Sequence, residues 1–287
     1  MTASPEPPAP PPPGVARTAI GVARIRAAES ERADRLFDDP FARAFVDAAP
    51  DLGPDPADLD ERSRRLVRWV AFFAIIRTRF YDDVLRGAVR SGCRQVVLVA
   101  AGLDTRAYRL DWPSEVRLVE LDMPEVLAFK DSVLGTCGAR PRCDRVAVGT
   151  DLLGDWMPDL LAAGLRPDEP TAWLVEGLLV YLDAAAAATL LGQVSELSAA
   201  GSRLACELQA PRPERAAADG GARVPGYARV PGYADLWKGG LGAELPDRLR
   251  GLGWAVDVND RAAVAALYGR PGPPSGGSGF VVAGRRP

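Results

Sequence analysis

Asp104, Asp122 and Asp151 each follow an apolar run in the middle of the chain. A continuous apolar run is typical of a buried parallel strand. In an open α/β sheet, ligands bind at the carboxyl ends of the strands. We therefore expect the three carboxylates to line one crevice, where they would accept hydrogen bonds from ribose hydroxyls and an adenine amine. This pattern predicts a nucleoside-bearing cofactor.

Small residues, among them Ala100 and Gly102, form the loop between the first apolar run and Asp104. The loop lacks the GxGxxG spacing of dinucleotide folds, so an NAD-dependent oxidoreductase is not supported. Taken alone, Gly102 could equally serve a tight strand-to-helix turn. An acid about 20 residues after a glycine loop is the position that accepts ribose hydroxyls, and Asp122 stands there. The combination favours S-adenosylmethionine as the cofactor.

Two further acids lie in apolar surroundings, Glu120 within the second run and Glu176 at the end of a fourth. Glu120 shares the strand face of Asp122, and we expect it to be hydrogen-bonded within the sheet or paired with an arginine. Glu176 at a strand end is costly unless it meets a cation or a hydrogen-bond donor. The sulfonium and amino group of S-adenosylmethionine would supply one. The alternatives are a helix N-cap or an ion pair with Arg77 or Arg79.

The chain of 287 residues contains no histidine. This excludes histidine general bases and Ser-His or Cys-His nucleophiles, so any chemistry must use carboxylates, tyrosines, arginines or a cofactor. A net charge of −3 argues against a nucleic-acid partner held by phosphate contacts, and no apolar run is long enough to cross a membrane. The four cysteines lack CxxC spacing, which predicts free thiols in a reducing cytoplasm and no metal site.

Strand-like and helical runs alternate along the second part of the chain, which predicts an α/β fold with a parallel sheet. The expected strands are 95–101, 116–121, 145–149, 171–176, 202–207, 254–258 and 279–284, and the expected helices between them are 124–134, 155–163, 183–199 and 243–252. The Pro/Gly-rich stretch between the last two strands shows no clear helix, which suggests an antiparallel last strand. Residues 15–50 and 57–91 have helical patterns, and residues 1–14 form a Pro-rich tail expected to be disordered.

The segment 208–240 is rich in Pro, Gly, Arg and Ala and contains the sequence Arg-Val-Pro-Gly-Tyr-Ala twice in succession, at 223–228 and 229–234. Such a stretch buries too little apolar surface to order itself alone. It is either a surface excursion lengthened by duplication or a lid over the substrate site. If it is a lid, Tyr227 and Tyr233 are its candidates for contact with the substrate.

Residues 95–110 resemble the signature of the leucine carboxyl methyltransferase family. The resemblance is to its bacterial branch of S-adenosylmethionine-dependent O-methyltransferases, which serve polyketide and other secondary metabolism. Further motifs follow in order: Asp38-Asp39-Pro40-Phe41-Ala42, Arg77-Thr78-Arg79-Phe80-Tyr81-Asp82-Asp83, Glu120-Leu121-Asp122-Met123-Pro124, Asp151-Leu152, Trp173-Leu174-Val175-Glu176-Gly177-Leu178-Leu179-Val180-Tyr181-Leu182, Gly251-Leu252-Gly253-Trp254 and Tyr268-Gly269-Arg270. The resemblance covers residues 15–285.

This resemblance implies a class I methyltransferase fold, which is a Rossmann-like seven-stranded sheet with an antiparallel last strand. A helical cap over 15–91 would precede the cofactor-binding core, 92–287. The implied cofactor-binding residues are Arg77 at the methionine carboxylate, Ala100, Gly102 and Asp104 in the loop, Asp122 at the ribose, Asp151 and Leu152 at the adenine, and Glu176 at the methionine end. The substrate candidates are Arg26, Tyr181, Tyr227 and Tyr233, and the nearest candidates for a catalytic group are Glu176 and Tyr181. Eukaryotic members have Gly where this loop begins with Ala100.

The sequence therefore predicts an O-methyltransferase that acts on a carboxylate of a small natural product or peptide. A carboxylate is already nucleophilic at neutral pH, so alignment and desolvation would suffice. One alternative is a hydroxyl or phenol methyltransferase, which would need a carboxylate base with a raised pKa. Another is a cofactor-binding protein without catalysis that acts as a partner.

Overall fold

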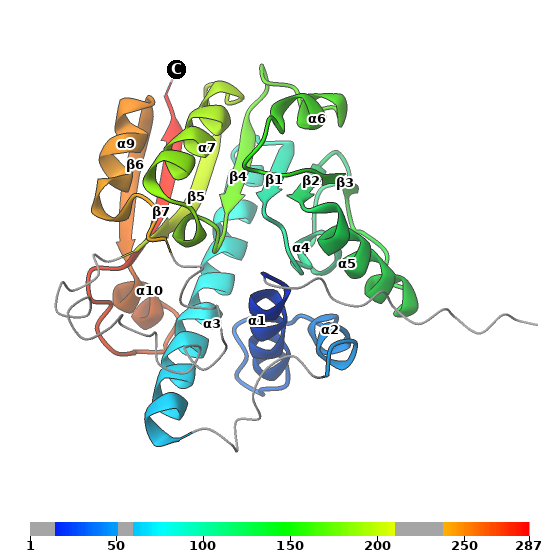
Figure 1. The fold of residues 1–287 in the computed structure, drawn as a ribbon, viewed down its shortest axis with the longest axis vertical. Coiled ribbons are helices and arrows are strands. Elements are labelled where there is room, and N and C mark those ends of the chain that lie inside the picture. The colour runs from blue at the N-terminus through cyan, green and yellow to red at the C-terminus, as the bar shows by residue number, and fades with distance from the viewer. Residues whose placement is uncertain (1–14, 51–59, 210–237, 287) are drawn as a thin grey trace, which may run out of the picture.

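Seven strands form one mixed sheet within residues 15–50, 60–209 and 238–286, which are the residues that the computed structural model describes (Figure 1). The strands are β1 (Gln95–Val99), β2 (Arg117–Asp122), β3 (Asp144–Gly149), β4 (Thr171–Val175), β5 (Arg203–Leu208), β6 (Trp254–Asp260) and β7 (Gly279–Arg285). Their order is β3-β2-β1-β4-β5-β7-β6. The first five pair in parallel, and β7 is antiparallel to both β5 and β6. The predicted antiparallel last strand is thus confirmed.

The helices are α1 (Val15–Ser30), α2 (Ala42–Asp47), α3 (Glu61–Arg90), α4 (Arg106–Arg109), α5 (Pro124–Thr136), α6 (Met157–Ala162), α7 (Ala184–Glu196), α9 (Leu245–Gly251) and α10 (Arg261–Leu267). The helix α10 corrects the expectation that no helix joins the last two strands. Its N-terminus is capped by Asp260, whose carboxylate accepts the N–H of Ala263 at 2.9 Å. The helix has only seven residues and is followed by Pro/Gly-rich sequence, so the sequence pattern did not indicate it.

The two central strands, β1 and β4, are buried along their whole length. Alternate residues of β1 enter two different hydrophobic clusters: Val96 and Leu98 pack with α1, α3 and α5, whereas Val97 and Val99 pack with α6, α7 and α9. A strand covered on both faces needs a continuous apolar run, which explains why the sequence revealed it. The run ends earlier than expected, at Val99, because the next residue leaves the extended conformation.

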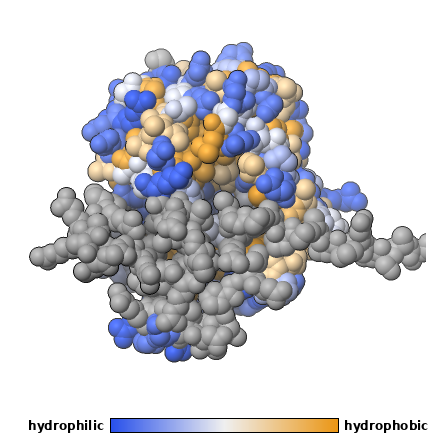
Figure 2. All heavy atoms as spheres, in the orientation of Figure 1, coloured by the Kyte–Doolittle hydropathy of each residue, from blue (hydrophilic) through white to orange (hydrophobic). Residues whose placement is uncertain are grey.

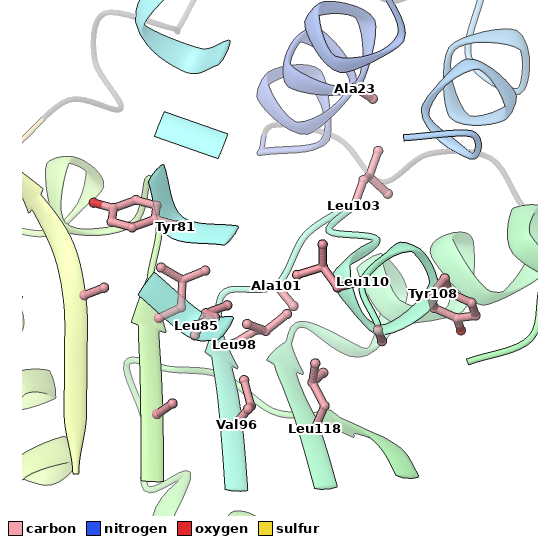
Figure 3. Close-up of a cluster of buried hydrophobic side chains, with 14 of the residues drawn as sticks. Ala23, Tyr81, Leu85, Val96, Leu98, Ala101, Leu103, Tyr108, Leu110 and Leu118 are labelled. Atoms are coloured by element: carbon pink, nitrogen blue, oxygen red, sulfur yellow. The ribbon is translucent and has the colours of Figure 1, made fainter. Parts of the chain in front are cut away.

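Helices α1 and α2 lie beyond the carboxyl ends of the strands, and the long helix α3 runs from that region along the sheet (Figure 1). Figure 3 shows Leu103, in the loop after β1, directed toward Ala23 of α1. Both residues belong to the hydrophobic cluster that also contains Tyr81 and Leu85 of α3. The N-terminal helices therefore pack on the loop where the cofactor is expected.

The side of the molecule in Figure 2 mixes hydrophilic and hydrophobic residues over its described part. Within the described ranges, no helix combines the length and apolar character that a bilayer crossing requires. The tail 1–14 and residues 210–237, with Tyr227, Tyr233 and the tandem repeat, lie outside the described residues. The segment 208–240, predicted as an insertion, overlaps β5 by one residue, because Leu208 is the last residue of that strand.

Candidate functional site

The loop after β1 is held in an unusual backbone conformation at the carboxyl end of the sheet. Ala100 has φ 57°, and it is the one non-glycine residue with positive φ in the part of the chain that the structure describes. A left-handed alanine costs about 1–2 kcal/mol. Hydrogen bonds fix the loop all the same: Ala101 donates to the carbonyl of Leu121 at 2.9 Å, and Asp104 donates to the carbonyl of Ala101 at 2.8 Å. Retained strain of this kind clusters at ligand sites.

Asp122, at the end of β2, binds the loop through backbone groups. Its carboxylate accepts the N–H of Gly102 at 2.6 Å and the N–H of Met123 at 2.7 Å. Burial raises the pKa of Asp122, and these two backbone N–H groups oppose that shift. Each carboxylate oxygen has a further lone pair, so Asp122 could accept ribose hydroxyls while it still holds the loop. Its contact with the ribose stays a prediction.

The predicted adenine end follows β3. Asp122 lies beside Gly149 in the β2–β3 register, and Asp151 is two residues further along the chain. Asp151 is exposed and accepts the N–H of Leu153 at 2.9 Å, and Leu152 is partly buried against the hydrophobic cluster. The structure thus brings Asp104, Asp122 and Asp151 to one edge of the sheet, at the ends of β1, β2 and β3.

Glu176 lies at the end of β4 between two guanidinium groups. Its Oε1 lies 2.8 Å from Nε of Arg77, and its Oε2 lies 2.8 Å from Nη1 of Arg106. Of the alternatives for Glu176, the structure shows the ion pair with Arg77, while Arg79 pairs with Asp83 instead. The Glu176 side chain keeps 16% of its surface exposed.

Arg77 is shared with a second carboxylate that the sequence analysis did not identify. Its Nη1 lies 3.0 Å from Oε1 of Glu207 on β5, and Glu207 also accepts the N–H of Gly177. Nη2 of Arg77 has no hydrogen-bond partner within the described ranges. That nitrogen remains available for the carboxylate of a methionine moiety, which is the role predicted for Arg77.

A buried ion-pair network extends from Glu176 to α3. Arg106 contacts Asp104 and lies 2.7 Å from Asp82, and Asp82 pairs with Arg109 at 2.6 Å. Sequence reasoning assigned no role to Asp82, Arg106 or Arg109, although all three stand in the quoted motifs. Asp82 could have indicated this network from the sequence, since a charged residue on the apolar face of a helix requires a partner.

The linked network carries more negative than positive charge. Within the described residues it joins three guanidinium groups to four carboxylates, namely Arg77, Arg106 and Arg109 with Asp82, Asp104, Glu176 and Glu207. Burial alone would raise the pKa of Asp104, but the charge of Arg106 lowers it to about 2. One excess negative charge suits a ligand with net positive charge, such as S-adenosylmethionine with its sulfonium, ammonium and carboxylate groups.

Arg26 and Tyr181 have different positions relative to this network. Nη2 of Arg26 donates to the carbonyl of Leu103 at 2.6 Å, and its Nη1 lies 3.3 Å from Asp39. It therefore fastens α1 to the cofactor loop. Tyr181 is partly buried in the short 3-10 helix Leu179–Tyr181 after β4 and adds to the raised pKa of Arg77. Arg26 in turn helps to lower the pKa of Asp104, after the larger effect of Arg106, so both residues lie near the network. Their contact with substrate stays a prediction.

Comparison with known proteins agrees with this geometry. Residues 19–195 match the model of a family described as leucine carboxyl methyltransferase. A Frankia alni protein that bears the name S-adenosyl-L-methionine-dependent methyltransferase is 50% identical over 276 residues, which is 96% of each chain. A Streptomyces avermitilis protein of the same name is 46% identical over 91% of this chain and 90% of its own. The crystal structure of a DUF574 family protein from S. avermitilis has the same fold, with TM-score 0.58 and 17% identity over 92% of this chain and 97% of its own.

Proposed function

Because the chain belongs to the leucine carboxyl methyltransferase family and is an S-adenosylmethionine-dependent methyltransferase, we propose that it methylates a carboxylate. The acceptor is a carboxylate of a small natural product or of a peptide, and the product is a methyl ester. The family's own description, which names carboxyl methylation, supports this choice of acceptor.

One observation carries the proposal: among the described residues, the methionine end of the site offers no carboxylate or histidine that is free of an arginine partner. The chain has no histidine. Among the described residues, Glu176 is held between two arginines, and the charge of Arg106 keeps the pKa of Asp104 at about 2. Burial raises the pKa of Tyr81 well above its ordinary value, so its phenolate does not form at neutral pH. Within the described residues, a hydroxyl acceptor would have no unpaired carboxylate or histidine to take its proton, whereas a carboxylate acceptor has no proton to lose.

The residues at the site would then bind and align rather than transfer protons. Asp122 would hold the ribose hydroxyls, and Nη2 of Arg77 would hold the methionine carboxylate. The bound cofactor supplies a methyl group on a positively charged sulfur. Because the acceptor and this sulfonium lose their opposite charges together, alignment and exclusion of water are the main requirements.

The proposal is tested by incubating the protein with methyl-labelled S-adenosylmethionine and a panel of carboxylic acids and phenols. We expect label in products that release methanol under mild base, which marks methyl esters. Label that appears only in products stable to mild base would contradict the carboxylate acceptor and favour the hydroxyl or phenol alternative.

A further inference from the structure

Arg261, the first residue of α10, is a buried arginine whose guanidinium makes no ion pair within the described residues. It keeps only 8% of its surface exposed. Its Nε is buried without a hydrogen-bond partner, and no ion pair or hydrogen bond of its guanidinium occurs in the part of the chain that the structure describes. Its neighbours are aromatic: its Cζ lies 5.4 Å from the ring centre of Phe280 and 5.9 Å from that of Phe73.

The other arginines buried to the same degree are all paired. Within the described residues these are Arg26 with Asp39, and Arg106 and Arg109 with Asp82. A guanidinium stays charged at any ordinary pH, and a buried charge without a partner is strongly unfavourable. Contacts with aromatic rings compensate only part of that penalty. Burial accordingly lowers the pKa of Arg261, and the nearby charge of Glu207 opposes that shift only in part. The geometry is that of a site prepared for an anion.

The position of Arg261 places this anion site beside the methionine end. Asp260 and Gly279 are register partners at the ends of β6 and β7, and Phe280 lies opposite Glu207 of β5. Directly opposed residues of antiparallel strands share one face of the sheet. Glu207 binds Arg77, which binds Glu176. Arg261 follows β6, and only β7 lies between β6 and the strand β5 that carries Glu207. The charges of Glu207 and Arg77 both act on the Arg261 guanidinium. Helix α10 lies on the side away from β1, β2 and β3 (Figure 1).

We propose that Arg261 binds the carboxylate of the acceptor and presents it to the cofactor, an inference that rests on the proposed carboxyl methylation. The guanidinium binds one carboxylate oxygen, and the other oxygen is the nucleophile. The bond from that oxygen to the methyl carbon forms as the carbon–sulfur bond breaks, and the electron pair of the broken bond stays on sulfur. No proton moves. The neutral ester no longer pairs with Arg261, so the transfer itself weakens the binding of the product.

The experiment is a calorimetric titration of the full chain saturated with S-adenosylhomocysteine. The probes are two matched pairs, octanoate with octanamide and benzoate with benzamide, which differ in charge but little in shape. For at least one pair we expect the wild type to bind the carboxylate about tenfold or more tightly than the amide, as for a charge-assisted pair. Arg261→Gln should abolish that preference. The control Arg250→Gln, at an exposed arginine of α9 paired with Asp247, should preserve it.

Affinity for S-adenosylhomocysteine serves as the check that each variant is folded, and it should change less than about twofold. If Arg261→Gln does not fold, Arg261→Lys keeps the charge without the planar donors and should show a reduced preference. An unchanged preference in the variant that folds would overturn the inference, and so would a wild type without preference in either pair. Methyl esters formed by Arg261→Gln at the wild-type rate would overturn the inference but leave the proposed function standing. If Arg261→Gln loses the carboxylate preference but the methyl products are stable to base, Arg261 would be confirmed as a carboxylate-binding residue and the proposed carboxyl methylation would be contradicted.

Discussion

At the ends of β1, β2 and β3, the site consists of strand-end carboxylates and backbone N–H groups, whereas at the ends of β4 and β5 it consists of charged side chains from four different elements. Asp122 binds the N–H groups of Gly102 and Met123, its neighbours at the same edge. Glu176 instead binds Arg77 of α3 and Arg106 of α4. We call these parts the adenosine half and the methionine half.

The difference predicts how each half responds to mutation. In the adenosine half, a carboxylate that binds backbone N–H groups can be removed without leaving a charged side chain buried alone. In the methionine half, every removed carboxylate takes an ion-pair partner from at least one arginine. Changes in the first half should therefore weaken cofactor binding, and changes in the second should weaken the fold itself.

The largest effect is expected for Asp82→Ala, which removes the one ion-pair partner that Arg109 has among the described residues and one of the three partners of Arg106. Breaking a buried ion pair on one side costs about 3–5 kcal/mol, and the free energy of unfolding from urea titration should fall by that amount. The control Asp83→Ala removes a half-exposed carboxylate paired with Arg79 and should cost about 1 kcal/mol or less. Equal losses in both variants would show that the network does not support the fold.

Next in size is Asp122→Ala in the adenosine half. Loss of charge-assisted hydrogen bonds to ribose hydroxyls, each worth about 1.5–3 kcal/mol, should lower affinity for S-adenosylhomocysteine roughly tenfold to a few hundredfold. Calorimetric titration measures this change, and circular dichroism verifies that the fold persists. Unchanged affinity in the folded variant would show that Asp122 does not bind the ribose.

Asp104, which follows β1 but pairs with Arg106 of the methionine half, and Asp122 should also differ in how acid affects stability. In the fold, the pKa of Asp104 is lowered from 3.8 to about 2, so its contribution of about 2 kcal/mol is present above pH 4 and lost as pH falls toward 2. The pKa of Asp122 is raised in the fold, so protonation of Asp122 favours the folded state. This stabilisation is present at low pH and is lost as pH rises. Urea unfolding at pH 7 and pH 3 should therefore show a smaller acid-induced loss in Asp104→Asn than in wild type, and a larger one in Asp122→Asn. The same change in both variants would contradict the assignment of the two environments.

The smallest effect is expected for Tyr81→Phe. The Tyr81 hydroxyl is fully buried without a hydrogen-bond partner in the described structure, and in Figure 3 it points away from Leu85, on the side of β5. Removal of an unpaired hydroxyl should change the free energy of unfolding by less than about 0.5 kcal/mol. A loss above about 1.5 kcal/mol would reveal a hydrogen bond in solution and place Tyr81 within the methionine half's network.

The adenosine half could be predicted from the sequence because each of its parts is local. An apolar run, a small-residue loop and a terminal acid all lie within a few residues of one another, and parallel strands align their ends at one edge. The prediction that Glu120 pairs with an arginine is confirmed. Glu120 is buried and pairs with Lys130 and Arg145, each within 2.8 Å. The predicted bounds of β2 and β3 differ from the structure by one residue, whereas β1 ends two residues early, because the left-handed conformation of Ala100 has no sequence signature.

The methionine half could be predicted only in part. Arg77 and Glu207 are 130 residues apart in the chain, and Arg106 and Glu176 are 70 apart, so no spacing rule connects them. Their pairing depends on how α3 crosses the sheet, which the helical pattern does not specify. Arg261 was missed for a related reason, since its helix α10 is too short to stand out beside the Pro/Gly-rich residues that follow.

The pH dependence of methyl transfer tests the central claim most directly, because the claim is that the acceptor loses no proton. For an acid of the panel that the protein methylates, kcat/KM should be constant within about twofold between pH 6 and 8.5, since an ordinary carboxylate is fully ionised there. It should fall only below about pH 5, where the acceptor becomes protonated. A rate that rises about tenfold per pH unit across the neutral range would show that a proton must be removed, and would contradict methylation of a carboxylate without a general base.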